Sequence, residues 1–542
     1  MDRRTFLQQG VAGGLAVAAS PAFPRSVSAE TAGAAAAPPR AFELEETSVA
    51  DLRAAMRSGR LTARGIAEQY LARIQEVDRR PGGTNAVIEV NPEALAIAEA
   101  LDRERAAGRV RGPLHGIPVL LKDNVDTGDR MLTTAGSLAL AGGPAARDAF
   151  IAERLRAGGA VILGKTNLSE WANFRSTRSS SGWSGRGGQT RNPYALDRNP
   201  CGSSSGSGAA IAANLAAVAV GTETDGSIVC PSSANGLVGI KPTLGMVSRT
   251  GIIPIAHSQD TAGPMARTVA DAAALLGVLA GADPRDAATE PGRTRVQPDY
   301  TVFLDRNGLR GARLGVVRGG TGVSDKVTAV LNGAVDAIRR LGATVLDVEI
   351  PHAGEYDDSE LEVLLYEFKA DLNAYLATRA PGTPRTLAEL IAFNQANAAR
   401  EMPFFGQELF ERAQAKGPLT SPEYRAALAK NHRLSRGEGI DAVLRAHRLG
   451  ALLAPTGGPA WPVDLVNGDR YTGGYSTASA VSGYPHVTVP MGYVHGLPVG
   501  ISFFGAAWSE PTLLRFAYAF EQETRVRQPP RLLPTLELGV PG

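Results

Sequence analysis

Three short segments of the chain carry residue types suited to attack on a carbonyl group. Lys122 follows the apolar run 117–121, a serine-rich segment spans 202–208, and Ser227 follows the turn-forming sequence Gly-Thr-Glu-Thr-Asp-Gly. Burial at the end of a strand lowers the pKa of a lysine, and the neutral amine is a base. Successive backbone amides in a tight turn can bind one anion. Each segment alone fits a structural turn, but together they indicate a catalytic constellation.

The rarity of lysine strengthens the interpretation of Lys122 as a base. Only 7 of the 56 basic residues are Lys, and the other 49 are Arg. A guanidinium keeps its proton at any ordinary pH, whereas an ammonium group loses it when its surroundings lower the pKa. A lysine in this chain is therefore expected to do something that arginine cannot, such as give up its proton.

A second lysine lies in a match to the phosphate-binding loop, G-x-x-x-x-G-K-[ST], at 159–166. That loop requires a strand before its first glycine and exposed amides between the glycines. Here a helix is expected at 149–157, and the apolar residues after Gly159 are themselves a predicted strand, 161–163. We therefore reject a phosphate site and expect Lys165 to begin a turn at the end of that strand.

The sequence at 202–206 also matches G-x-S-x-G, with Ser204 in the place of the nucleophile. This elbow requires a core strand directly before it, but residues 192–201 are rich in turn-forming types. No histidine further along the chain has a context that marks it as a triad partner. The chain has no H-E-x-x-H, C-x-x-C or S-x-x-K motif, so we predict no metal site and no cofactor.

The three segments resemble the amidase signature family, serine amidohydrolases with a Ser–cis-Ser–Lys triad. The signature itself covers about residues 202–231. Weaker similarity extends over about 113–281 and returns at 454–456 and 483–505. No cofactor is implied by this resemblance.

The resemblance assigns a role to each residue of the constellation. It implies a base at Lys122, a bridging serine on a cis peptide bond at Ser203 and a nucleophile at Ser227. Thr177 and Ser203 are candidate substrate contacts. The oxyanion hole is expected to consist of four backbone amides, those of Thr224, Asp225, Gly226 and Ser227.

One position departs from the family pattern. Many members have Gly-Gly-Ser-Ile-Arg around the nucleophile, where this chain has Asp-Gly-Ser-Ile-Val at 225–229. The variant is similar to peptide amidases, which remove the C-terminal amide of peptides. Val229 cannot anchor a carboxylate as an arginine would. We therefore expect a neutral C-terminal carboxamide as the substrate, ammonia as a product, and no cleavage of internal peptide bonds.

Two other functions stay open at this point. An amidase of the same family can act on aryl, fatty or cyclic amides instead. A glutamine-amidase subunit of a tRNA-dependent assembly fits less well, because the N-terminus predicts export and aminoacyl-tRNA is cytoplasmic. The intact set of Lys122, Ser203 and Ser227 argues against a relative without activity.

The elements that must position these residues alternate along the chain, which predicts an α/β layer fold with a largely parallel, buried sheet. The resemblance implies an α/β/α sandwich around a large mixed, twisted sheet. Residues 357–450 show no strand pattern and are expected to form helices inserted over the sheet. The predicted strands lie at 86–90, 117–121, 161–163, 314–317, 345–348, 452–454 and 501–504, and the predicted helices at 92–107, 149–157, 324–341 and from 509 onward.

The segment at 176–208 has the composition of a linker, because 16 of its 33 residues are Gly or Ser. It also contains Trp183, several arginines and two Asn-Pro turns, and it leads directly into an apolar helix predicted at 209–220. Linkers seldom lie between core elements. We therefore expect an ordered loop whose backbone approaches the substrate closely.

The N-terminus has the pattern of a twin-arginine signal peptide. Arg3 and Arg4 precede a weakly apolar run at 11–19, and Val-Ser-Ala at 27–29 resembles a cleavage site. We therefore predict a signal peptide at 1–29 and export to the periplasm or beyond.

The remaining chain is expected to hold a flexible arm at 30–45 and a single amidase domain at 46–542, with the signature core at about 113–281. A helix needs about 20 apolar residues to span a bilayer. No run of that length occurs in the sequence, so no stable membrane anchor is predicted.

Composition narrows the class of partner. Hydrophobic residues make up 44% and charged residues 20%, which is typical of a folded globular protein. The 56 basic residues are balanced by 54 acidic ones, which argues against nucleic acid as the main partner. The family resemblance implies a small-molecule or peptide amide as the partner. Two cysteines, Cys201 and Cys230, are too few for a disulfide framework. Their pairing and the oligomeric state stay open.

Overall fold

The computed structural model describes residues 41–318 and 324–538. The predicted signal peptide, 1–29, and residues 30–40 of the predicted arm lie outside the described residues. Residues from Phe42 onward form one compact unit. Leu44 is only 1% exposed, so the packed chain begins before the expected boundary at residue 46.

The centre of the molecule is a sheet of eleven strands in the order β1-β3-β2-β6-β8-β7-β12-β13-β11-β9-β10. A separate pair, β4 and β5, forms a small ribbon. The bounds are β1 Val87–Val90, β2 Pro118–Lys122, β3 Val161–Thr166, β4 Trp183–Ser184, β5 Gly188–Gln189, β6 Val218–Glu223, β7 Val238–Lys241, β8 Thr261–Ala266, β9 Arg313–Val317, β10 Thr344–Val348, β11 Ala451–Pro455, β12 His486–Val494 and β13 Leu497–Phe504.

The sheet is mixed, as the family resemblance implied, and the expectation of a largely parallel sheet is wrong. Strand β2 pairs in parallel with β3 and β6, and β9 pairs in parallel with β10 and β11. The strands between these two groups pair antiparallel. One reason is a two-residue turn between β12 and β13, His495 and Gly496 with φ 49° and 79°. Such a turn can join only antiparallel strands.

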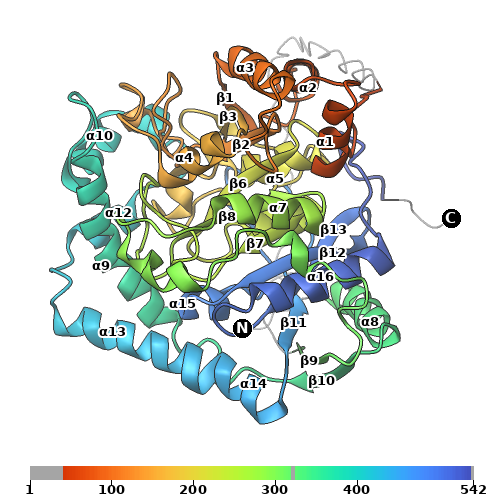
Figure 1. Cartoon of the computed structure of the whole chain (residues 1–542). Helices are drawn as coiled ribbons and strands as arrows, with labels where there is room; N and C mark the ends of the chain where they lie inside the picture. The colour runs from red at the N-terminus through yellow and green to blue at the C-terminus, as the bar shows by residue number, and fades with distance from the viewer. Residues whose placement is uncertain (1–40, 319–323, 539–542) are drawn as a thin grey trace, which may run out of the picture. The chain divides into compact units, whose positions relative to one another are not determined.

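Helices cover both faces of the sheet, which confirms the predicted α/β/α sandwich (Figure 1). Phe503 of β13 packs against Phe520 of α16 on one face, with ring centroids 6.0 Å apart. A Cβ on Gly500 would lie 3.0 Å from Ser233 of α6 on the other face. The bounds of the helices outside the inserted region are α1 Val49–Arg57, α2 Ala63–Arg73, α3 Ala94–Ala106, α4 Phe150–Ala157, α5 Ser205–Ala212, α6 Val229–Ala234, α7 Val269–Leu279, α8 Asp325–Arg340, α15 Thr477–Ser482 and α16 Glu510–Thr524.

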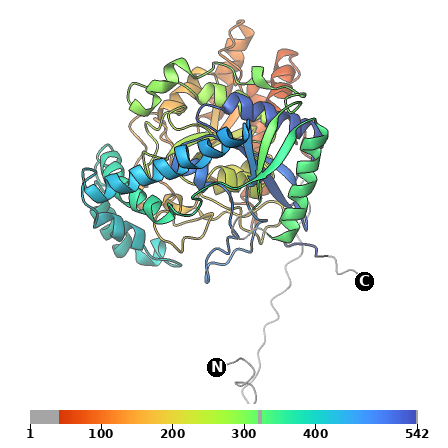
Figure 2. The same ribbon diagram turned by 90° about the horizontal axis from the view of Figure 1, so that it is seen from below.

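Residues 357–450, all of which the structure describes, form helices and no strand, as predicted. Figures 1 and 2 show them gathered at one side of the sheet. Phe368 of α9 stacks against Phe174 and Phe410, with ring centroids 5.0 and 5.2 Å apart. The inserted helices therefore pack against the segment that leads into the Gly/Ser-rich loop. They are α9 Asp357–Leu376, α10 Leu387–Ala396, α11 Ala398–Glu401, α12 Glu408–Gln414, α13 Pro422–His432 and α14 Asp441–His447.

Two local predictions need correction. The apolar helix expected at 209–220 ends at Ala212, and the strand β6 begins at Val218. Asn214, with φ 58°, lies in the turn between them. Lys165 lies inside β3 rather than in a turn after it, because β3 continues to Thr166.

Within the two described stretches, no helix combines the length and the apolar character needed to cross a bilayer.

Candidate active site

Lys122 is the last residue of β2, and the sheet brings it next to β6. Leu121 of β2 pairs in parallel with Val220 of β6. Parallel neighbours end at the same edge of a sheet, where open α/β sheets bind their ligands. The Nζ atom of Lys122 accordingly lies 2.9 Å from Thr222 Oγ1 and 3.2 Å from the Thr222 carbonyl oxygen.

The third neighbour of the Lys122 amine is Ser203. Lys122 Nζ lies 2.8 Å from Ser203 Oγ, and the Gly202–Ser203 peptide bond is cis. A Cβ on Gly202 would lie 2.2 Å from Ser169 Oγ, so only glycine fits before this serine. The structure thus brings together two of the three residues that the sequence predicts as a triad.

Burial changes the chemistry of Lys122. The side chain is 0% exposed, and burial lowers its pKa from 10.5 to about 7. The negative charges of Asp260 and Glu223 oppose this shift by favouring the ammonium form. Above pH 7 the amine is mostly neutral, which is the form that accepts a proton.

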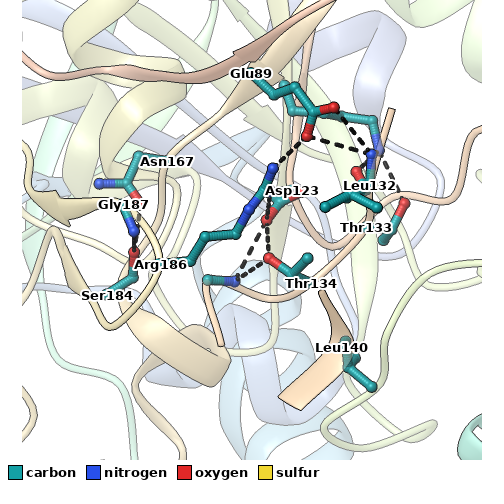
Figure 3. Close-up of polar contacts among 12 residues, drawn as sticks. Glu89, Asp123, Leu132, Thr133, Thr134, Leu140, Asn167, Ser184, Arg186 and Gly187 are labelled. Carbon is teal, nitrogen blue, oxygen red and sulfur yellow. Dashed lines mark hydrogen bonds and ion pairs between the residues drawn. The ribbon is translucent and has the colours of Figure 1, made fainter. Parts of the chain in front are cut away.

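A buried polar network holds the chain directly after Lys122 (Figure 3). Arg186 Nη1 lies 3.3 Å from Asp123 Oδ2, and Arg186 also pairs with Glu89 of β1. Thr134 donates from its hydroxyl to Asp123, and its backbone N–H donates to the Asp123 carbonyl oxygen at 3.0 Å. The network joins the end of β2 to β1 and to the loop that follows β2. These contacts fix the backbone next to Lys122.

The Gly/Ser-rich segment 176–208 is a packed loop and not a linker. Ser204 donates from its backbone N–H to the Ser227 carbonyl oxygen at 3.1 Å, which joins this loop to the turn before α6. The Ser204 hydroxyl is 0% exposed and donates to the Thr222 carbonyl oxygen at 3.0 Å. The described residues 190–203 form no strand directly before it, so Ser204 lacks the context of a nucleophile elbow.

Ser227 follows a tight turn at the end of β6. Gly226 has φ 77°, a conformation that residues with a Cβ rarely adopt. In the described part of the chain, none of the four backbone amides at 224–227 donates a hydrogen bond to another residue. The next two amides, of Ile228 and Val229, donate to Glu223 Oε2 at 2.7 and 3.0 Å. The turn thus leaves its first four N–H groups free for a ligand.

Exposure increases from the predicted base to the predicted nucleophile. Lys122 is 0%, Ser203 1% and Ser227 9% exposed. The described contacts include no hydrogen bond between the Ser203 and Ser227 hydroxyls. Hydrogen bonds of a catalytic site are often long without substrate and tighten in the complex. Ser227 is the most exposed of the three.

A polar cavity of about 490 Å³ lies beside the two serine loops. Gly202 and Gly226, the neighbours of Ser203 and Ser227, both contribute to its wall. Thr177 also lines it, with a hydroxyl that donates to Glu408 of α12 at 2.9 Å. The lining among the described residues includes two carboxylates and no Lys, Arg or His, and the aromatic and acidic members are Asp225, Trp461, Asp469 and Tyr471.

The two cysteines, whose pairing the sequence left open, form a disulfide. Cys201 and Cys230 have Cα atoms 6.0 Å apart and are bonded through sulfur. Cys201 precedes Ser203 by two residues, and Cys230 follows Ser227 by three. The disulfide therefore joins the two loops that carry the predicted catalytic serines.

One group among the described residues has the side-chain types of a metal site, namely His257, Glu367 and Asp371. His257 Nδ1 lies 2.8 Å from Asp371 Oδ2, and Nε2 lies 3.4 Å from Glu367 Oε1. In this arrangement each ring nitrogen faces a different carboxylate. The group is an ion pair, and these carboxylates raise the pKa of His257 against the effect of burial.

Sequence reasoning missed several polar partners of the site. Thr222 contacts the Lys122 amine, and Asn124 donates to Thr222 Oγ1 at 2.9 Å. Asp260 accepts from Thr224 Oγ1 at 2.6 Å, and Asp225 accepts from Thr477 Oγ1 at 2.8 Å. Asp260 and Thr477 come from distant parts of the chain, so no spacing in the sequence could have indicated these pairs.

The chain matches the sequence model of the amidase family over residues 65–514. The crystal structure of native peptide amidase from Stenotrophomonas maltophilia is 55% identical, with a TM-score of 0.87, over 91% of this chain and 100% of that one. A probable amidase of Arabidopsis thaliana is 43% identical over 91% of this chain and 93% of its own length. A glutamyl-tRNA(Gln) amidotransferase subunit of Symbiobacterium thermophilum is 37% identical over 86% of this chain and 95% of its own length.

Proposed function

The chain belongs to the amidase family and hydrolyses amide C–N bonds, and from this premise we propose that it is a serine amidohydrolase that uses Lys122, Ser203 and Ser227. The observation that carries the proposal is the 2.8 Å distance between Lys122 Nζ and Ser203 Oγ. It places a fully buried amine with a pKa of about 7 against a serine that is next to the cavity.

The neutral amine of Lys122 has two N–H groups and one lone pair. The two N–H groups donate to Thr222 Oγ1 and to the Thr222 carbonyl oxygen, at 2.9 and 3.2 Å. The lone pair is then directed at Ser203, whose hydroxyl proton it accepts. Ser203 in turn takes the proton of the Ser227 hydroxyl, so Lys122 acts on the nucleophile through one bridging serine.

Ser227 Oγ then bonds to the carbonyl carbon of the substrate, and the electron pair of the C=O bond moves to the oxygen. The free backbone amides of Thr224, Asp225, Gly226 and Ser227 stabilise this oxyanion. Preorganised donors of this kind are often the largest single contribution to amide hydrolysis, because they are already aimed at the charge that develops.

Collapse of the intermediate breaks the C–N bond. The proton held by Lys122 returns through Ser203 to the nitrogen, and ammonia leaves. Water then loses a proton to the same relay and attacks the ester on Ser227, which releases the acid and restores the serine hydroxyl. Amide and water are consumed, and acid and ammonia are formed.

The proposed substrate is the C-terminal carboxamide of a peptide. Among the described residues, the cavity lining offers no cation to hold a free carboxylate, and its two acidic members, Asp225 and Asp469, offer none of the positive charge that a carboxylate needs. Val229 is 1% exposed and lies at the start of α6, outside the lining. The 55% identity with a peptide amidase over 91% of the chain also supports this specificity.

A second cavity supports an alternative substrate class. It has a volume of about 350 Å³, borders Thr222 and Thr224, and includes Ile252, Ile253 and Ile255 in its lining. An aryl or fatty amide would gain apolar contacts there. A glutamine-amidase role in a tRNA-dependent assembly has less support, because the amidotransferase relative is 37% identical and the peptide amidase 55%.

We also propose that the protein is exported by the twin-arginine route. The support is the Arg3–Arg4 pattern with its short apolar run and cleavage-like sequence. The Cys201–Cys230 disulfide is consistent with an oxidising compartment, where such bonds persist.

The substrate proposal is tested by incubating the enzyme with an amidated peptide, its free-acid twin and the anilide of the same peptide, and following all three by mass. We expect the amidated peptide to lose only its terminal amide and the free acid to stay intact. Peptides of varied sequence should behave alike, since main-chain contacts in a polar cavity tolerate many side chains.

Internal fragments from either peptide would contradict the proposed specificity. Turnover of the anilide without turnover of the amidated peptide would move the assignment to aryl amides. Ser227→Ala is the control, and it must abolish every activity that is attributed to this site.

A further inference from the structure

Two consecutive residues of one loop fix the residue at the start of the oxyanion turn. Thr224 donates from Oγ1 to Asp260 Oδ1 at 2.6 Å, and its carbonyl oxygen accepts from Gln259 Nε2 at 3.2 Å. We propose that Gln259 and Asp260 are positioning residues of the oxyanion hole and that helix α9 holds them in place. This inference rests on the proposed function, since it concerns the same turn.

Peptide geometry explains how Gln259 acts on the oxyanion hole. The Thr224 carbonyl and the Asp225 N–H belong to one peptide unit, which is planar and trans, so the two groups point in opposite directions. A hydrogen bond that fixes the carbonyl therefore fixes the direction of the N–H as well. Gln259 aims the Asp225 amide without touching the substrate.

Asp260 is itself held rigidly. Its Oδ2 atom accepts from the backbone N–H groups of Ile255 and Ala256 at 2.8 and 2.9 Å, while Oδ1 accepts from Thr224. The carboxylate thus joins the 255–256 backbone to the Thr224 side chain. Because both oxygens of the Asp260 carboxylate are hydrogen-bonded, the carboxylate has little freedom to rotate, and it holds the Thr224 side chain in one position.

The loop that carries these residues is bound along one helix of the inserted region. Gln259 Nε2 donates to a glutamate at 2.8 Å, the Ser258 N–H donates to a second at 2.8 Å, and the His257 N–H donates to an aspartate at 3.0 Å. These acceptors are spaced by seven and four residues, which places them on one face of a helix. They are Glu360, Glu367 and Asp371 of α9.

The charge of the same carboxylate also acts on the base. The charge of Asp260 raises the pKa of Lys122 against the larger effect of burial, and Glu223 acts in the same direction. Burial raises the pKa of Asp260 itself to about 6, although Thr224 and Arg249 favour its ionised form. Above pH 6 Asp260 is mostly an anion, so its removal must lower the pKa of Lys122.

The first test compares Thr224→Val with Thr224→Ser on an amidated peptide. The valine variant keeps the shape but loses the hydroxyl that Asp260 holds. We expect kcat to fall about 10- to 100-fold, less than the loss of a whole oxyanion donor. KM should stay unchanged, and the serine variant should recover most of the lost kcat. Thermal denaturation confirms that both variants are folded.

The second test is the pH profile of Asp260→Asn, with Gln259→Met as a second variant should Asp260→Asn fail to fold. For Asp260→Asn, kcat should fall and the midpoint of the rise in kcat/KM with pH should move to lower pH. Thr224→Val and Gln259→Met should lower kcat without moving that midpoint, because neither changes a charge. A purely structural role would lower stability and leave both kcat and the midpoint unaltered.

The outcomes separate this inference from the proposed function. If the wild-type enzyme hydrolyses neither the amidated peptides nor the anilide, the proposed function is wrong. If the wild type is active and Thr224→Val has the kcat of wild type, or Asp260→Asn keeps the wild-type midpoint, the positioning role is wrong and the function stands.

Discussion

At the scale of single residues, the contacts of a buried lysine decide whether it can serve as the base. Lys122, Lys165 and Lys241 are each 0% exposed. Lys165 donates to the Val125 carbonyl oxygen at 2.8 Å and to Thr133, and Lys241 donates to a carbonyl oxygen at 3.2 Å. Only Lys122, of the seven lysines, all of which are described, contacts a serine hydroxyl. Lys122 was predictable from the sequence because lysine is rare in this chain and because this lysine lies at the end of a predicted strand.

The pH dependence follows from the same residue. The folded-state pKa of Lys122 is lowered to about 7, so the amine is protonated and inactive as a base below that value. We expect kcat/KM for an amidated peptide to be small at acidic pH, to rise as pH increases through about 7 and then to level off. A pH profile of kcat/KM measures this, since it reports groups of the free enzyme.

A rise that occurs only near pH 10, the ordinary range of a lysine, would contradict the role of burial. The control is an ester of the same peptide. Its hydrolysis uses the same relay and should show the same lower midpoint.

At the scale of elements, the sequence predicts isolated strands and helices well and their junctions poorly. The strands β9, β10 and β11 and the helix α8 lie within a few residues of the predicted bounds. The run 209–220 was interpreted as one helix, whereas it contains the end of α5 and the start of β6. A continuous apolar run has no period that separates a buried helix from a buried strand, which is why this junction could not be predicted.

The disulfide joins the two loops that carry the predicted catalytic serines and should stabilise them. It closes a loop with a sequence separation of 29 residues. Loop-closure entropy predicts that its removal lowers the free energy of unfolding by about 3 to 4 kcal/mol. We expect the double variant Cys201→Ser/Cys230→Ser to unfold at a lower urea concentration than the oxidised wild type.

Reduction offers a matched control for that prediction. Wild-type protein treated with dithiothreitol should unfold like the double variant, and the double variant should not respond to dithiothreitol. Equal urea midpoints for oxidised and reduced wild type would show that the bond does not stabilise the loops.

At the scale of the whole molecule, the site depends on contacts that no local pattern reveals. The resemblance predicts the triad and the oxyanion turn from Lys122 and residues 202–231. The partners of that turn come from elsewhere: Asp260 from the loop before β8 and Thr477 from α15. Glu360 of α9 is linked to the turn through Gln259. These residues are far apart in the sequence and close together in the fold, so no sequence pattern could have paired them. The contacts of the inserted helices could be recognised only in the structure.

The most direct test of the account is to locate the covalent intermediate. The enzyme is mixed with a peptide substrate, quenched in acid during turnover and digested, and the acyl group is mapped by mass. We expect an acyl group on Ser227, no adduct in Ser227→Ala, and a loss of kcat in that variant of up to about 10⁶-fold. An acyl group on Ser203 or Ser204, or near-normal turnover by a folded Ser227→Ala protein, would contradict it.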